Sequence, residues 1–280
     1  EQGCAARMMS LQDWRAHPQG QAVNAEPLIH WSPRSAVGSK GWAGHKLRPL
    51  SGLKVLDLTR VLAGPVCSRM LAGFGAQVLR IDPPGWGEGL VETEVTPGKR
   101  LATLDLKSKA GRDMFLSLLA TADVLIHGYR KGALDDLKLC DDVRRAVNPG
   151  LIDVALNAYG WTGPWAGRRG FDSLVQMSSG IAHQGMIWKQ ADVPTPLPVQ
   201  ALDFATGYLM AAAAVRAFRL KAQGGPVMSA RLSLARTAAL LASVKTDNDG
   251  AAFSPVTDTD VSPNVEPTDW GPARRVRFPA

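Results

Sequence analysis

Residues 53–82 have the sequence LKVLDLTRVLAGPVCSRMLAGFGAQVLRID, and this stretch decides the fold. Its first part, 53–59, is a short run rich in apolar residues, which predicts a buried strand. Pro65 in the following turn suits the first position of a helix, and a helix is expected over 66–77. Residues 78–82 then predict a second strand. A strand, a helix and a further strand in this order are typical of a doubly wound sheet.

The same alternation of strands and helices continues along most of the chain. Further strands are expected over 101–106, 123–127, 151–156 and 226–232, and further helices over 110–121, 133–147, 172–180, 203–223 and 233–245. Alternating strands and helices build parallel sheets that are covered on both faces. We therefore predict an α/β fold with a Rossmann-like parallel sheet and helices on both faces.

Two flanking segments lack this alternation. Residues 1–50 carry scattered Trp and Pro without a sustained period, and we interpret them as an N-terminal arm. Residues 51–245 form the main domain. Residues 246–280 are polar and rich in Pro, which predicts an extended crossing segment or a partly disordered tail.

Composition limits the classes of protein to which the chain can belong. Hydrophobic residues make up 45% and charged residues 20%, as in an ordinary globular enzyme. No apolar run reaches the ~18 residues that span a bilayer, and the N-terminus lacks the pattern of a signal peptide. Cys4, Cys67 and Cys140 lack metal-ligand spacing. We expect reduced thiols, no metal, no membrane association and a cytoplasmic location.

The formal net charge of +7 suits an anionic ligand. Nucleic acid is not expected, because the basic residues are scattered and no platform of aromatic and basic side chains appears. A cofactor that bears phosphate groups and a basic surface that is merely solvated are both compatible with this charge.

Residues 196–207, PLPVQALDFATG, carry one carboxylate, Asp203, between a Pro-rich segment and an alanine-rich helical pattern. The dipole of a helix favours the ionised form of a carboxylate in its first turn. An ionised and partly desolvated carboxylate is a potential nucleophile toward an activated acyl group. The alternative is an N-cap, since Asp is among the preferred N-cap residues. This run alone favours the N-cap.

Common cofactor and catalytic fingerprints are missing from the sequence. It contains no Gly-x-Gly-x-x-Gly turn, no phosphate loop, no serine elbow and no His-Glu-x-x-His. The glycine-rich run 85–89 follows a strand without opening a helix. His127, Lys107 and Arg130 lie at strand ends, where open parallel sheets hold ligands. The alternative for His127 is a structural role, and the alternative for Lys107 and Arg130 is that each is an ordinary surface charge.

Several collinear motifs give a more specific indication. They are 50–65 (LSGLKVLDLTRVLAGP), 75–82 (GAQVLRID), 98–107 (GKRLATLDLK), 122–130 (ADVLIHGYR), 163–176 (GPWAGRRGFDSLVQ), 201–207 (ALDFATG) and 230–234 (ARLSL). In this order and spacing the chain resembles the family III CoA-transferases over about residues 50–245. That family includes formyl-CoA transferase, carnitine CoA-transferase and the 2-methylacyl-CoA racemases.

The resemblance implies a CoA-binding, Rossmann-like catalytic domain over 51–245, in an interlocked homodimer. Its substrates would be an acyl-CoA and a carboxylic acid, with coenzyme A as the carrier and no metal. The catalytic aspartate of the family falls on Asp203. The implied CoA contacts fall on Leu62, Ala63, Pro83, Leu104, Asp105, Leu106, Lys107, Gly128, Tyr129, Arg130, Arg169, Gly170, Phe171 and Asp172.

The resemblance also implies a mechanism. Asp203 attacks the thioester of the donor to give a mixed anhydride, and the released thiolate returns to form an aspartyl-CoA thioester. An acceptor carboxylate then takes the CoA by the same steps in reverse. Backbone N–H groups at the start of the Asp203 helix, or in the turn at Leu62 and Ala63, are expected to stabilise the oxyanions.

The chain also departs from the family pattern. Phe171 stands where the racemases carry a His that exchanges protons, so racemisation by that pair is disfavoured. Leu62 replaces the Gln of formyl-CoA transferase, and Pro83 replaces a frequent Arg. We expect a shortened or missing small domain, with the glycine-rich shield absent or supplied by another chain. The alternatives are a racemase or isomerase that uses another base, and a CoA-binding subunit without catalysis.

The identity of the acyl group is left open. Four large apolar residues follow the family motif, and they suit either an apolar acyl pocket or the core: Phe171, Met177, Met186 and Trp188.

Overall fold

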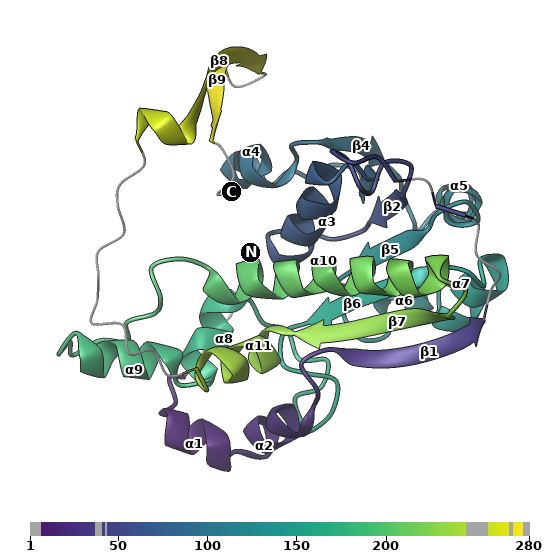
Figure 1. Cartoon of the computed structure of the whole chain (residues 1–280). Coiled ribbons are helices and arrows are strands. Elements are labelled where there is room, and N and C mark those ends of the chain that lie inside the picture. The colour runs from purple at the N-terminus through teal and green to yellow at the C-terminus, as the bar shows by residue number, and fades with distance from the viewer. Residues whose placement is uncertain (1–6, 37–40, 43, 245–256, 269–270, 277–280) are drawn as a thin grey trace. The chain divides into compact units, whose positions relative to one another are not determined.

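The computed structural model describes residues 7–36, 41–42, 44–244, 257–268 and 271–276. The chain divides into two compact units, Glu1–Ser243 and Val244–Ala280. The larger unit contains a seven-stranded sheet, and the smaller contains a two-stranded sheet (Figure 1).

The large sheet has the strand order β1-β7-β6-β5-β2-β3-β4. Its parallel strands are β2 (Lys54–Asp57), β3 (Gln77–Asp82), β4 (Lys99–Thr103), β5 (Val124–His127), β6 (Ile152–Asn157) and β7 (Pro226–Ser233). This arrangement confirms the predicted Rossmann-like sheet. β1 (His30–Ala36) adds an antiparallel edge strand that the sequence did not predict. Its Pro33 is compatible with an edge position, where a missing N–H costs no ladder bond.

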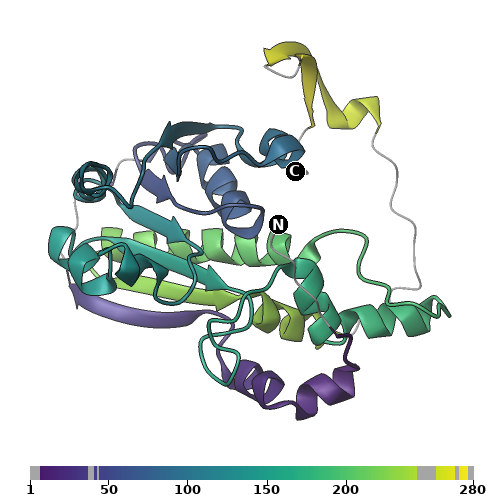
Figure 2. The same ribbon diagram turned by 180° about the vertical axis from the view of Figure 1, so that it is seen from behind.

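Helices cover both faces of the sheet, as predicted (Figures 1 and 2). On one face, α3 (Ala63–Gly73) and α10 (Ala201–Ala222) share a core with β2, β5, β6 and β7. On the other face, α5 (Lys109–Leu119), α6 (Ala133–Asp136) and α7 (Asp141–Val147) belong to the layer built on Phe115, Leu125 and Leu139. The sheet is therefore buried from both sides, which explains its continuous apolar strands.

Several helix boundaries differ from the prediction. α3 begins three residues early, which makes Pro65 its third residue, and Gly75 with a φ of 102° follows its end. The single helix expected over 133–147 is two helices, because Lys138 adopts a left-handed φ of 59° between them. The remaining elements near the sheet are η1 (Gly89–Val91), α4 (Glu92–Val95), α8 (Asp172–Ser178), α9 (Ile181–Trp188) and α11 (Leu234–Leu241). The sequence did not predict α9.

The N-terminal segment contains α1 (Leu11–Ala16), α2 (Pro18–Ala25) and β1, all within the larger unit. Ser10 and Asp13 form a capping box at the start of α1. The two helices meet so closely that a Cβ on Gly20 would lie 1.8 Å from the carbonyl oxygen of Trp14. Trp14 is buried in a core shared with Tyr159 and Leu234.

The smaller unit consists of η2 (Asp258–Asp260) and an antiparallel hairpin of β8 (Val261–Thr268) and β9 (Gly271–Val276). Arg275 pairs with Glu266 across this hairpin at 2.8 Å. The sequence did not predict these strands, because their Pro and charged residues obscure any alternation.

Within the described residues, Cys67 is a buried free thiol and Cys140 a partly buried one, whereas Cys4 lies outside them. Among the same residues, no helix is both long and apolar enough to span a bilayer.

Candidate active site

A cavity of about 770 Å³ lies along the carboxyl ends of the parallel strands. Its walls come from the segments that follow β2, β5 and β6, together with Asp203 near the start of α10 and Arg231 on β7. β2 and β5 are neighbours in the sheet, and the chain continues from them to opposite sides. Ligands of open α/β sheets bind at such a switch point.

The structure brings most of the site residues predicted from the sequence into this one cavity. Those that line it are Leu62, Ala63, Gly128, Tyr129, Arg130, Arg169, Gly170, Phe171 and Asp203. Pro83 directly follows β3 and is partly buried, without lining the cavity. Asp172 is buried behind Asp203.

The run Leu104–Lys107 lies apart from this group. It follows β4, the last strand at one edge of the sheet, and does not line the cavity. Asp105 accepts a hydrogen bond from the N–H of Lys107 at 2.9 Å, and Leu106 is buried in the core. These residues form the turn into α5.

Asp203 is the third residue of α10, and the N-cap of that helix is Gln200. The alternative that Asp203 serves as an N-cap is therefore wrong. One turn later, Gly207 lets α10 cross α3 at close range, since a Cβ there would lie 2.5 Å from the carbonyl oxygen of Ala63. Residues four apart share one face of a helix, so this crossing sets Asp203 against the first turn of α3.

Asp203 is 8% exposed. Burial, with a further contribution from the negative charge of Asp172, raises the pKa of Asp203 to about 7. The helix dipole alone predicted an ionised carboxylate, and these two effects outweigh it. Asp203 is thus poised between its charged and neutral forms near neutral pH.

Asp172 holds the start of α10 in place. Its Oδ2 accepts a hydrogen bond from the backbone N–H of Asp203 at 2.9 Å, and its Oδ1 accepts one from Gln176. The Oε1 of Gln176 in turn accepts from the N–H of Leu197 at 2.7 Å. Because the N–H of Asp203 is occupied, this donor at the start of α10 is not free for an oxyanion.

The first turn of α3 offers other donors. Ala63 and Gly64 line the cavity at the start of this helix. The first N–H groups of a helix have no partner within the helix, and they carry its positive dipole end. This turn therefore presents donors to the cavity next to Asp203.

Buried charges fix the turn between β2 and α3. Asp57 at the end of β2 pairs with Lys99 at 3.2 Å, and both side chains are fully buried. Lys99 also donates to the carbonyl oxygen of Pro65 at 2.9 Å. Burial lowers the pKa of Lys99, and the Asp57 carboxylate partly opposes that shift. The pair ties the start of α3 to the sheet.

Val61 in the same turn has a left-handed φ of 68°, which is strained for a β-branched residue. Its N–H donates to Oε1 of Glu88, and Glu88 pairs through Oε2 with Arg80 at 2.7 Å. The glycine-rich run 85–89 thus supports the strained turn through Glu88.

Basic and aromatic side chains surround the cavity. The guanidinium carbon of Arg60 lies 5.1 Å from the ring centre of Trp86 and 5.6 Å from that of Tyr129. Arg231 lies 5.0 Å from the ring centre of Trp161. The lining includes the basic side chains of Arg60, Arg130, Lys131, Arg144, Arg168, Arg169 and Arg231. This charge suits a ligand with several anionic groups.

Sequence reasoning missed several of these lining residues. Arg60 lies inside the first family motif, and Arg168 is adjacent to the identified Arg169. Trp86 occupies the glycine-rich run that was set aside because no helix follows it. Arg231 lies inside the last family motif, 230–234. Trp161 precedes the 163–176 motif and carried no usable signal, because only the fold brings β7 and the segment after β6 together.

His127 has a structural partner as well as a place in the cavity wall. Its Nε2 lies 3.0 Å from Oδ1 of Asp153, and Arg144 donates to Oδ2 of the same carboxylate at 2.8 Å. Burial tends to raise the pKa of Asp153, but His127 and Arg144 outweigh it and hold that pKa well below its usual range.

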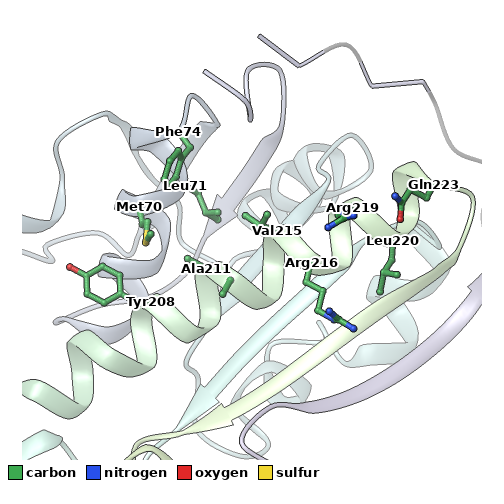
Figure 3. A pocket seen from close by; sticks show the side chains of 11 residues that line it. Met70, Leu71, Phe74, Tyr208, Ala211, Val215, Arg216, Arg219, Leu220 and Gln223 are labelled. Carbon is green, nitrogen blue, oxygen red and sulfur yellow. The ribbon is translucent and has the colours of Figure 1, made fainter. Parts of the chain in front are cut away.

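A second cavity of about 610 Å³ is lined by α3 and α10 (Figure 3). Met70, Phe74, Tyr208 and Val215 give it an apolar wall beside Arg216 and Arg219. It holds none of the site residues predicted from the sequence. The first cavity is therefore the candidate active site. Within the described part of the chain, no group of three or more His, Cys, Asp or Glu residues could hold a metal ion.

The sequence pattern of CoA-transferase family III matches residues 50–269. The chain belongs to this family. Named relatives agree with the match. An acyl-CoA transferase of Fusarium pseudograminearum is 29% identical over 244 residues, which cover 80% of this chain and 53% of that protein.

Two further relatives extend the family comparison. The probable fatty acyl-CoA transferase Rv3272 of Mycobacterium tuberculosis is 33% identical over 192 residues, or 64% of this chain and 48% of that one. The alpha subunit of succinyl-CoA–L-malate CoA-transferase from Chloroflexus aurantiacus is 33% identical over 180 residues, or 59% and 41%. The chain spans about half the length of the curated relatives that it matches.

Solved structures of the family share the fold. The crystal structure of Rv3272 matches with a TM-score of 0.63 at 32% identity, covering 69% of this chain and 55% of that one. A CAIB/BAIF family protein from Brucella suis matches with a TM-score of 0.61 at 27% identity, covering 81% and 65%.

Proposed function

We propose that this family III chain moves CoA from an acyl-CoA to a carboxylic acid through an aspartyl-CoA thioester on Asp203. The observation that carries the proposal is the position of this buried carboxylate beside the first turn of α3, in a cavity ringed by basic side chains. The family's named acyl-CoA transferases support the same reaction class.

Binding of CoA is supported by the charge of the cavity. CoA carries a diphosphate and a further phosphate on its ribose, and guanidinium groups are well matched to phosphate oxygens. Arg130, Arg168 and Arg169 present such groups from the segments after β5 and β6, and Lys131 adds an ammonium group. The thioester end of the molecule would then lie toward Asp203.

The reaction uses the ionised carboxylate of Asp203. One of its oxygens attacks the thioester carbonyl, the C–S bond breaks, and the thiolate leaves with the electron pair, which yields a mixed anhydride. The thiolate then attacks the Asp203 carbonyl of the anhydride and releases the donor carboxylate, leaving aspartyl-CoA. The acceptor carboxylate repeats the two steps in the opposite order, and the Asp203 carboxylate is restored.

The environment of Asp203 fits this chemistry. A pKa of about 7 leaves a substantial ionised fraction at neutral pH and a carboxylate that is more basic than in water. The N–H groups in the first turn of α3 are the proposed donors to the oxyanion of each tetrahedral intermediate. Phe171, which lines the cavity, has no proton to exchange at the α-carbon of an acyl group.

Trapping tests the covalent step. The chain is incubated with a panel of acyl-CoA donors, treated with hydroxylamine and digested, and the peptide that contains Asp203 is weighed by mass spectrometry. We expect a hydroxamate on Asp203. Asp203→Asn should lose transfer and trapping while it binds CoA with near-normal affinity. Transfer that persists in Asp203→Asn would sink the assignment.

The same incubation separates the alternatives. Deuterium incorporation at the α-carbon of the acyl group, without trapping, would indicate a racemase or isomerase that uses another base. Binding of CoA with neither product would indicate a subunit without catalysis. The panel of donors and acceptors also identifies the acyl group.

We further propose the interlocked homodimer. It follows from the family resemblance, and the cytoplasmic location likewise stays a prediction. Light scattering on the purified chain measures its mass in solution. A monomeric mass would contradict the dimer.

A further inference from the structure

We propose that helix α2 is a positioning clamp for the active site, with Gln19 and Glu26 holding the arginine loop, defined here as residues 159–171. This inference rests on one part of the proposed function, which is that the arginine loop binds the phosphates of CoA. The loop carries Arg168 and Arg169 into the cavity, and it ends at Phe171 beside Asp172.

The arginine loop has no regular structure that would hold it. Between β6 and α8 it contains three glycines with positive φ, Gly160 at 99°, Gly163 at 82° and Gly167 at 84°. Such residues give up much conformational freedom on ordering. A fixed position for the loop therefore requires partners from outside it.

Gln19 supplies the first set of contacts. Its side chain is fully buried, and its Nε2 donates to the carbonyl oxygens of Tyr159 and Thr162 at 2.7 and 2.8 Å. Its Oε1 accepts from the N–H of Trp165 at 2.6 Å. One amide group thus joins three backbone positions of the loop, and all of its hydrogen-bonding atoms are used in this way.

Glu26, at the C-terminal end of α2, supplies the second set. Its Oε1 accepts from the N–H of Trp161 at 2.8 Å, and from both the N–H and the hydroxyl of Thr162 at 2.8 and 2.7 Å. Its own carbonyl oxygen accepts from Nε of Arg236 at 2.7 Å, which ties this end of α2 to α11.

The loop and the helix are also matched in shape. A Cβ on Gly163 would lie 2.6 Å from both Oε1 of Gln19 and Cβ of Ala22, so only glycine allows this approach. The contact continues through Trp165, whose ring lies 4.6 Å from His17. The guanidinium carbon of Arg168 in turn lies 4.4 Å from the ring centre of Trp165. His17, Trp165 and Arg168 thus form a continuous series of contacts from the start of α2 to an arginine that lines the cavity.

These contacts give the N-terminal segment an indirect role in ligand binding. It holds the loop that binds the ligand and lies outside the cavity itself. Gln19 and Glu26 are positioning residues, and neither lines the cavity. Fixing a binding loop before the ligand arrives removes the cost of ordering it during binding. Loosening the loop should therefore weaken CoA binding and leave the chemistry at Asp203 in place.

Two pairs of variants of the full chain test the clamp. Glu26→Ala removes three hydrogen bonds, whereas Glu26→Gln keeps an acceptor at the same place and should rescue them. Gln19→Ala is compared with Gln21→Ala, because Gln21 lies on the same helix and is exposed. Each variant is examined by hydrogen–deuterium exchange with mass spectrometry and by titration calorimetry with CoA.

We expect faster exchange in peptides covering 159–171 for Gln19→Ala and Glu26→Ala, and CoA affinity that is weaker by roughly tenfold. Glu26→Gln and Gln21→Ala should stay within about twofold of the wild type. The value of kcat at saturating substrate should change little. If Gln19→Ala fails to fold, the Glu26 pair alone decides the question.

Unchanged exchange in 159–171 for Glu26→Ala would overturn the clamp. Faster exchange with unchanged CoA affinity would overturn its role in positioning. A wild-type chain that does not bind CoA would remove the proposed function, while the exchange measurement would still decide whether α2 holds the loop. The two failures are therefore distinguishable.

Discussion

The turn after β2 and the arginine loop after β6 line the same cavity, but they are held in opposite ways. The turn at 58–64 is fixed from inside the sheet by buried charges, Asp57 with Lys99 and Arg80 with Glu88. The arginine loop is fixed from outside by the neutral amide of Gln19 and the carboxylate of Glu26.

This difference follows from what each region is proposed to do. The turn presents backbone donors beside Asp203, where small displacements alter a transition state. Rigid support from the sheet suits that task. The arginine loop presents long side chains to phosphates, and these tolerate more movement. We therefore expect damage to the turn to reduce stability and chemistry, and damage to the loop to reduce binding.

The largest effect is expected from Lys99→Met, which breaks the interior support of the turn. The change leaves the buried carboxylate of Asp57 without its cation, and such losses cost about 3–5 kcal/mol. The free energy of unfolding from urea titration measures this. The control is Lys109→Met, because the pair of Lys109 with Asp113 is exposed and should contribute under about 0.5 kcal/mol. Equal losses in the two variants would contradict the interior role of Lys99.

The next largest effect is a dependence of the free energy of unfolding on pH, and it is caused by Asp203, which lines the cavity together with the turn and the arginine loop. The pKa of Asp203 is about 7 when folded, above its ordinary value of 3.8. Its neutral form therefore stabilises the fold fully below about pH 3.8, and this contribution is lost as pH rises through about 7. At about 1.4 kcal/mol for each pKa unit, the linkage amounts to roughly 4 kcal/mol. Asp203→Asn should remove it, so the stabilities of wild type and variant should diverge between pH 4 and 8.

Chemical denaturation across that pH range measures the divergence, with the exposed Asp105→Asn as the control. Transfer by the wild type should rise with pH and reach half its maximum near pH 7, since the ionised carboxylate is the nucleophile. Parallel stability curves for wild type and Asp203→Asn would show that the pKa is not raised.

The comparison also explains what the sequence predicted and what it did not. The turn lies inside the first motif, with Asp57 in the same stretch and Lys99 in the third motif, so its place in the site could be predicted. The arginine loop could be predicted as a contact, but its support could not. Gln19 lies about 140 residues from its partners, in a segment without hydrophobic periodicity.

For Asp203, too, the sequence predicted the residue and did not predict the effect of its tertiary contacts. Its identity and its place near a helix start could be predicted from 196–207. Its pKa could not, because the shift depends on burial and on Asp172, which the fold brings beside it. Local chemistry suggested a charged group, and tertiary contacts made it one that titrates near neutrality.

A smaller loss is expected from Gly207→Ala, which disturbs the contact between α10 and the turn. The added Cβ meets the carbonyl oxygen of Ala63, and overpacking of this kind costs about 1–3 kcal/mol. Because the crossing also places Asp203, kcat should fall together with the free energy of unfolding. Gly73→Ala in α3 is the control, since a Cβ there meets nothing within 4 Å. A variant with normal kcat would show that Asp203 is placed by other contacts.

The smallest effect is expected from Trp86→Ala, at a partly exposed position in the cavity wall. Trp86 is 45% exposed, and its ring packs on Arg60, a residue of the turn after β2. Both residues line the cavity. Such a cation–π contact, together with stacking on a ligand, contributes about 0.5–1.5 kcal/mol. The dissociation constant of CoA should therefore rise about three- to tenfold, with kcat and stability unchanged. Trp188→Ala is the matched control, because Trp188 is 80% exposed and does not line the cavity. Equal CoA affinity in the two variants would mean that the turn supports chemistry alone, which would sharpen its contrast with the arginine loop.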